Sequence, residues 1–257
     1  MSSENSDPRG EAPARPWGPA NGPSHHAASP PAHRRIPLLS ILFFVLMLAL
    51  VGGRAYQELS TPQGWAYWNS YFSPGMTASL VQSTSASGSV PALALAVSGT
   101  IGAASAGWFR NKLDEAKLRP GDTVAFSSPG GDVDQAIIMG ELIRSRGLNT
   151  AVATFDAAGR MRPSYCASAC VLAYAGGTVR LGVPGSTLGV HRFTTEGERG
   201  DLVAETQRTA GIILGYMTRM GIASSVMEAM SASSDIRWLT PQQAVEMKLV
   251  TQSVAQR

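Results

Sequence analysis

Ser168 is the residue of this chain best suited to act as a nucleophile. It lies in Cys-Ala-Ser-Ala-Cys, residues 166–170, directly before an apolar segment that favours a helix. A serine at the first turn of a helix exposes its hydroxyl, and the neighbouring backbone N–H groups point in the same direction. The pattern favours attack on a carbonyl group, although N-capping of the helix is the simpler explanation of such a serine on its own.

His191 is the residue that could activate this serine. Of the four histidines in the chain, His25, His26 and His33 fall in a polar N-terminal tail, which leaves His191 for the folded part. It ends a strand-like segment, residues 188–191, that follows the serine motif. A single histidine at a strand end is usually structural, but one that shares a sheet edge with a candidate nucleophile favours a Ser–His pair.

Two glycines after a short buried strand could bind a negative charge. Gly130 and Gly131 follow Ser-Ser-Pro, residues 127–129, and precede a predicted helix. Glycine permits backbone conformations that aim N–H groups into a cleft, which is what an oxyanion hole requires. Taken alone, the pair is more typical of an ordinary turn between a strand and a helix.

Alternating strands and helices would position these fragments. Apolar segments bounded by turn residues predict a parallel α/β core with right-handed crossovers. Ligands in such sheets lie at the carboxyl ends of the strands, where residues 127–132 fall. The predicted strands are 91–97, 123–126, 148–154, 179–183 and 188–191, and the predicted helices are 104–118, 133–146, 171–175, 202–220 and 224–230.

The N-terminal region predicts a membrane anchor. Residues 1–35 are rich in Pro, Ser, Gly and Ala, a composition typical of disorder. Residues 36–53 are apolar and uncharged, and as a helix they would span about 27 Å. A buried helix of a soluble protein and a cleaved signal peptide are the alternatives. By the positive-inside rule, Arg34 and Arg35 place the tail in the cytoplasm. The rest of the chain would then lie on the opposite side of the membrane.

The rest of the chain divides at a linker. Residues 54–90 form an aromatic juxtamembrane segment followed by small and polar residues, and residues 91–257 form the expected catalytic domain.

Composition excludes several classes of function. The net charge is only +3 and no Lys/Arg cluster occurs, so we expect no nucleic-acid partner. Cys166 and Cys170 are the two cysteines, and no further histidine or cysteine lies near enough for a zinc site. They form either a disulfide that stiffens the serine turn or two buried thiols. We expect no metal and no cofactor.

In their order and spacing, the three motifs resemble the Clp protease proteolytic subunit family of the Clp–crotonase superfamily. Ser-Pro-Gly-Gly at residues 128–131, the small-residue serine motif and the strand that ends in His191 carry the resemblance, which covers about residues 91–252. The chain is most similar to the membrane-anchored or periplasmic bacterial branch, in which Cys-x-Ser-x-Cys surrounds the nucleophile. This implies an α/β spiral of strand–helix units, a homo-oligomer, and a bacterial inner-membrane protein with its domain in the periplasm.

The resemblance also implies roles for individual residues. Ser168 would be the nucleophile and His191 the base. The amides of Gly131 (or Gly130) and Ala169 would form the oxyanion hole.

Asp235 is the expected third member of a Ser–His–Asp triad. The resembled family places its aspartate shortly before a helix with an Ala-x-Glu core, and here that segment is residues 235–246. An ungapped alignment puts the family aspartate on Ile236, so a one-residue bulge is needed to bring Asp235 into place. A surface aspartate that caps a turn is the alternative.

These features predict a membrane-anchored serine peptidase that hydrolyses unfolded or small peptides. The chain contains no Gly-x-x-x-x-Gly-Lys motif, and ATP is scarce outside the cytoplasm, so we expect neither ATP use nor an ATPase partner. A catalytically degenerate domain that binds peptides or scaffolds a complex is the main alternative. Crotonase-like coenzyme A chemistry is a less favoured alternative. A Ser–Lys mechanism is also less favoured, because the lysines Lys112, Lys117 and Lys248 lie outside the motifs.

Overall fold

The computed structural model describes residues 38–62, 64–65, 68–69, 75–83, 92–193 and 202–254. The chain forms two units, Met1–Val51 and Gly52–Arg257, and each is described by itself. The expected disordered tail, and the part of the expected linker that follows residue 83, lie outside the described residues.

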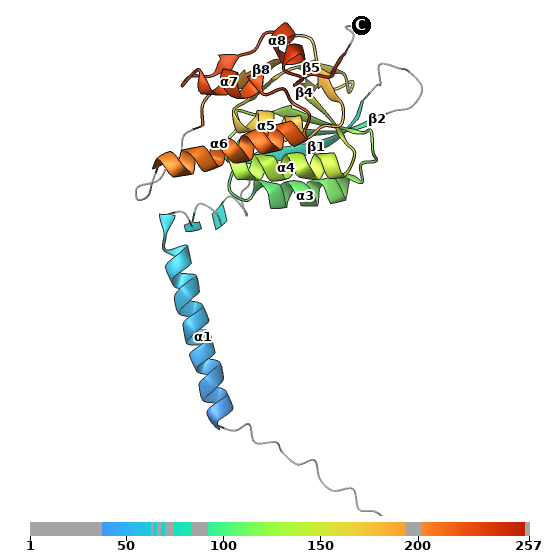
Figure 1. Ribbon diagram of the computed structural model, residues 1–257. Helices are drawn as coiled ribbons and strands as arrows, with labels where there is room; N and C mark the ends of the chain where they lie inside the picture. Colours follow the sequence, from blue (N-terminus) through green and yellow to red (C-terminus); the bar gives the residue numbers. More distant parts are fainter. Residues whose placement is uncertain are drawn as a thin grey trace, which may run out of the picture. The chain divides into compact units, whose positions relative to one another are not determined.

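The first described element is a long apolar helix, α1 (Leu38–Leu59), in which no residue is buried (Figure 1). Its most apolar 18-residue window has a mean hydropathy of 2.3, so by length and composition it can cross a membrane. The helix continues past the expected end at residue 53 into a polar segment, because nothing in residues 54–59 breaks a helix. The expected apolar helix is therefore present, and it is longer than the apolar run alone.

The folded domain is built on a mixed sheet that is mostly parallel. β2, β3, β4, β7 and β10 are parallel neighbours in that order, while β1 pairs with β2 and β5 pairs with β4 in antiparallel fashion. The parallel α/β core is thus confirmed. The strands are β1 (Met76–Ser83), β2 (Ala92–Gly99), β3 (Thr123–Ser127), β4 (Asn149–Phe155), β5 (Met161–Pro163), β7 (Arg180–Gly182) and β10 (Gln252–Ser253).

β1 places the start of this sheet before the expected domain boundary at residue 91. All eight residues of β1 pair with β2, from Met76 opposite Gly99 to Ser83 opposite Ala92. Met76 is buried in the main core, whereas much of the strand is exposed at the edge of the sheet. β1 alternates polar and apolar residues and has no apolar run of its own. Its composition therefore did not predict a strand, which becomes apparent only from its pairing with β2.

Helices cover the sheet and bury the core. α4 packs against both α3 and α5, and the three lie side by side in Figure 1. Phe109 of α3 and Phe126 of β3 are fully buried, with ring centroids 6.4 Å apart. The helices are α3 (Ser105–Ala116), α4 (Val133–Ser145), α5 (Ala169–Ala175), α6 (Leu202–Arg219), α7 (Ser225–Ser231) and α8 (Pro241–Glu246), close to the predicted ranges.

A second, three-stranded sheet carries the serine and histidine motifs. β6 (Tyr165–Ala167) pairs in parallel with β8 (Thr187–Val190), and β9 (Arg237–Trp238) pairs in antiparallel fashion with β8. A parallel bridge between Ser128 and Cys166 connects β6 to the segment after β3. The small sheet therefore brings all three motifs of the sequence to one region.

A buried arginine joins the ends of three helices. The Arg180 guanidinium donates to the carbonyl oxygens of Gly177 (3.1 Å), Met220 (3.2 Å), Lys248 (2.8 Å) and Leu249 (3.0 Å), which follow α5, α6 and α8. Among the described residues no carboxylate pairs with it, and burial lowers its pKa from the usual value. The negative ends of the helix dipoles compensate the charge.

Candidate active site

Ser168 lies on a sharp turn between β6 and α5. Its backbone has φ 57° and ψ −130°, a conformation that is rare for a residue other than glycine. Its N–H donates to Gly189 O at 2.8 Å. The side chain makes no capping hydrogen bond to α5, so N-capping does not account for this serine. Strand, strained serine and helix form the arrangement known as a nucleophile elbow, which exposes the hydroxyl.

The hydroxyl of Ser168 faces His191. Ser168 Oγ lies 2.7 Å from Nε2 of His191, within hydrogen-bonding distance. The parallel pairing of β6 with β8 sets this contact, since Ala167 is opposite Gly189 and both strands end beside each other. An imidazole at this distance is placed to remove the hydroxyl proton as the oxygen attacks.

The glycine loop after β3 lies against the turn that carries Ser168. Gly130 packs directly on the turn, because a Cβ added to it would lie 2.8 Å from Ser168 Cβ and 2.9 Å from Ala169 N. Its own N–H donates to Ser128 Oγ at 3.1 Å. Within the described chain, no acceptor binds the N–H of Gly131 or of Ala169. The N–H groups of Gly131 and Ala169 are thus available to an acceptor, whereas that of Gly130 is engaged by Ser128.

Cys166 and Cys170 form a disulfide that brackets Ser168. The sequence left this open, because two cysteines on adjacent turns of one helix do not reach disulfide geometry. Here Cys166 belongs to β6 and Cys170 to α5, and the change of direction between them brings their Cα atoms to 5.4 Å. Both cysteines are completely buried.

The structure does not bring Asp235 to His191. Asp235 is exposed, and no hydrogen bond or ion pair joins its carboxylate to another described residue. Its backbone carbonyl accepts a hydrogen bond from Ser233 Oγ at 2.9 Å, as in a turn. Within the described residues, the imidazole has Ser168 as its hydrogen-bond partner.

The chain before β9 is irregular at this point. Val190 is opposite Arg237, yet the next link is the hydrogen bond from Arg192 N to Ser233 O, so the chain bulges between residues 233 and 237. The bulge leaves Asp235 on the surface. Ile236 instead packs over Gly189, where a Cβ would lie 2.6 Å from Ile236 Cγ2.

A narrow apolar cleft opens beside the serine and histidine. Its volume is about 20 Å³, so it is a shallow feature in this structure. Its walls come from α4, α5, α6, α7 and the end of β8, which meet only in the folded domain, so no sequence pattern indicated them. The residues that line it with Ser168 and His191 are Val133, Ala169, Leu172, Val190, Phe193, Ile213 and Met230.

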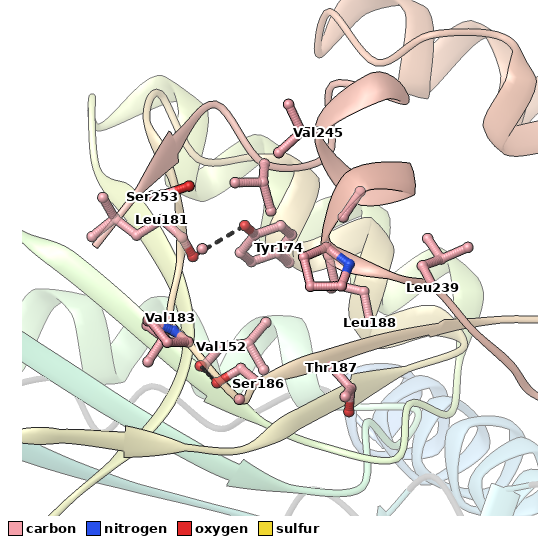
Figure 2. A pocket seen from close by; sticks show the side chains of 16 residues that line it. Val152, Tyr174, Leu181, Val183, Ser186, Thr187, Leu188, Leu239, Val245 and Ser253 are labelled. Carbon is pink, nitrogen blue, oxygen red and sulfur yellow. Dashed lines mark hydrogen bonds between the residues drawn. The ribbon is translucent and has the colours of Figure 1, made fainter. Parts of the chain in front are cut away.

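A larger cavity of about 320 Å³ lies elsewhere, next to α8 (Figure 2). Its lining is mostly apolar and includes Leu239 and the ring of Tyr174. The Tyr174 hydroxyl donates to Leu181 O at 3.3 Å, and burial raises its pKa well above the usual value. Neither Ser168 nor His191 lines this cavity, so it is separate from the candidate active site.

Comparison with solved structures finds 580 similar chains, two of which are described below. No family model and no curated protein matches the chain. The chain is similar to a mutant of ClpP1 from Listeria monocytogenes, with 17% sequence identity, coverage of 62% of this chain and 88% of that one, and a TM-score of 0.48. It is also similar to a mutant of the 1510-N membrane-bound stomatin-specific protease, with 14% identity, coverage of 63% and 77%, and a TM-score of 0.46.

Proposed function

We propose that this chain is a membrane-anchored serine peptidase in which Ser168 is the nucleophile and His191 the general base. The observation that carries the proposal is the strained Ser168 turn, with Oγ 2.7 Å from His191 Nε2. A backbone conformation that costs about 1–3 kcal/mol persists where function requires it, and here it points a hydroxyl at an imidazole. Two unpaired N–H groups, of Gly131 and Ala169, support the same chemistry.

The reaction follows from this arrangement. Ser168 Oγ attacks the peptide carbonyl carbon while His191 accepts the hydroxyl proton, and the N–H groups of Gly131 and Ala169 stabilise the negative oxygen. His191 then gives the proton to the leaving amine, the C–N bond breaks, and an acyl-serine remains. A water molecule, deprotonated by His191, attacks the acyl group and releases the acid and the free serine.

A domain that binds peptides without cleaving them is the second candidate. It is favoured by the exposed position of Asp235, because a base that lacks a carboxylate partner loses much of its catalytic advantage. The two candidates differ in whether Ser168 reacts, which a covalent probe reports directly.

The test is labelling of the purified full-length protein with a fluorophosphonate, which phosphonylates activated serines. We expect wild type to be labelled, Ser168→Ala to be unlabelled, and His191→Ala to be labelled at least about 100-fold more slowly. Ser145→Ala is the matched control, because Ser145 is an exposed serine at the end of α4. Labelling of Ser168→Ala at the wild-type rate would remove Ser168 as nucleophile, and a folded but unlabelled wild type would favour the binding domain.

We further propose that the substrates are unfolded or small peptides and that cleavage needs no ATP. A quenched fluorescent peptide library, incubated with and without ATP, measures both points. Equal rates under the two conditions are expected. A requirement for ATP would contradict this part of the proposal.

The proposed anchor is α1, with the N-terminus in the cytoplasm and the domain in the periplasm of a bacterial cell. Its apolar length and the arginines before it, Arg34 and Arg35, support this orientation. Protease added to intact spheroplasts should digest the domain. Digestion that occurs only after lysis would reverse the orientation.

A further inference from the structure

The disulfide between Cys166 and Cys170 closes a small ring around the nucleophile. Cys166 lies in β6 and Cys170 in the first turn of α5, so the covalent bond crosses the turn that Ser168 makes. Both sulfur-bearing side chains are fully buried beneath the turn. The bond therefore limits how far β6 and α5 can separate at Ser168, where the backbone φ is positive.

The same ring is linked to both oxyanion donors. Cys166 forms a parallel bridge with Ser128, whose hydroxyl accepts the Gly130 N–H at 3.1 Å, so the glycine loop is attached to the strand end of the disulfide. Ala169, which carries the second free N–H, directly precedes Cys170 at the helix end. Movement of either cysteine relative to the other changes the spacing of the groups that would hold the oxyanion.

Backbone hydrogen bonds from Ser168 N to Gly189 O (2.8 Å) and from Val171 N to Ser168 O (3.0 Å) hold the turn, and the disulfide adds a covalent constraint to them. Ser168 makes no capping hydrogen bond, and its side chain is directed at His191 instead. Strained conformations persist only when the surrounding structure over-determines them. A covalent bond from residue i−2 to residue i+2 is such a constraint, and it spans the serine turn directly.

We propose that the Cys166–Cys170 disulfide is a positioning element for Ser168, so that activity at this serine requires the oxidised protein. The inference rests on the proposed function. A dithiol reagent transfers two electrons and two protons to the disulfide. The products are two cysteine thiols and the cyclic disulfide of the reagent. The freed turn then relaxes, and Ser168 Oγ moves out of line with His191 and the oxyanion donors.

The experiment compares wild type with the double variant Cys166→Ala/Cys170→Ala by fluorophosphonate labelling. A displacement near 1 Å at a reacting group costs up to about 100-fold, so we expect labelling to be slowed by about 10- to 100-fold. With an activated ester as substrate, kcat should fall by this factor while KM changes little. Val171→Ala is the matched control, since it removes buried volume from the same helix without touching the ring, and it should lower Tm but not slow labelling.

Reversible reduction of wild type distinguishes the effect of losing the disulfide bond from the effect of replacing the cysteine side chains. Wild type reduced with dithiothreitol, with two free thiols counted by titration, should slow to the rate of the double variant and recover on reoxidation. The double variant should be insensitive to dithiothreitol. Equal labelling rates in oxidised and reduced wild type would overturn the proposal.

Hydrogen exchange distinguishes failure of this inference from failure of the proposed function. The peptide that covers residues 165–172 should exchange faster in the double variant than in wild type, while α4 exchanges at the same rate in both. This outcome supports the positioning role even if wild type is not labelled at all, in which case the peptidase proposal alone is lost. Unchanged exchange in this peptide overturns the positioning role whether or not Ser168 reacts.

Discussion

Alanine in place of Gly130 should slow the reaction of Ser168 far more than its effect on stability explains. Gly130 has a φ of +98°, and its new Cβ would lie 2.5 Å from Ala167 O, 2.8 Å from Ser168 Cβ and 2.9 Å from Ala169 N. Ordinary contacts of a Cβ begin at 3.4 Å, so the serine turn must move by roughly 0.6 Å or more. Displacements of this order at a nucleophile cost about 10- to 100-fold in rate.

Gly121→Ala provides the matched control for this variant. Gly121 also has a positive φ, +92°, but no atom lies within 4 Å of the position that its Cβ would occupy. Both substitutions carry the cost of a left-handed alanine, about 1–3 kcal/mol, which lowers Tm by about 3–10 °C for a domain of this size. Gly130→Ala adds the collision with the turn, so it should be the less stable of the two and the only one with slow labelling.

The assay is the rate of fluorophosphonate labelling, measured well below the lower of the two melting temperatures so that both proteins are folded. Circular dichroism confirms folding, and the rate is expressed per folded molecule. We expect wild type and Gly121→Ala to react at similar rates and Gly130→Ala to react about 10- to 100-fold more slowly. If Gly130→Ala reacted as fast as Gly121→Ala, the packing of Gly130 against an active nucleophile would be refuted.

Three further predictions test the packing and electrostatics of the domain. Gly140→Ala in α4 would put a Cβ on the Tyr216 hydroxyl and should cost about 1–3 kcal/mol. Tyr216→Phe should recover part of that loss in a double-mutant cycle followed by urea unfolding, and strictly additive losses would contradict the overlap. Arg180→Met should cost about 2–4 kcal/mol because it leaves buried carbonyl groups unpaired, and a Tm within 2 °C of wild type, roughly the shift from 1 kcal/mol, would contradict this role. The pKa of Asp156 is lowered from 3.8 to about 2. The main cause is the hydrogen bond that its carboxylate accepts from the backbone N–H of Arg160. Its contribution to stability is therefore present above pH 3.8 and lost as pH falls toward 2. Asp156→Asn should flatten the dependence of Tm on pH in that window, and an unchanged slope would exclude Asp156 as its source.

Local patterns were sufficient to predict most of the domain. Apolar segments of strand and helix length, separated by turn residues, predicted α4 and α6 to within a few residues and a parallel core sheet. These elements follow from short stretches of sequence because each buries a continuous face of its own. The edge strand β1 and the short strands β5, β9 and β10 lack such a face, and they form only because a partner strand supplies the hydrogen bonds.

The candidate site was predicted in its residue types but not in its geometry. Ser168 and His191 stood out by composition and position, yet the positive φ of Ser168 depends on the pairing of β6 with β8 and on the start of α5. The position of Asp235 depends on the bulge before β9, which is a property of strand register and has no local signature. The disulfide was left open for the same reason, because the end of β6 at Ala167 decides whether the two cysteines can meet.

Arg180 makes the domain dependent on the last part of its chain. Two of its four carbonyl acceptors, on Lys248 and Leu249, are 68 and 69 residues further along the sequence. Without these residues, Arg180 would keep only the carbonyl groups of Gly177 and Met220 as acceptors. The end of α5, the helix that begins at the nucleophile, is held by this same group through Gly177. Residues far along the chain from Ser168 therefore help to hold the end of the helix that begins at this serine.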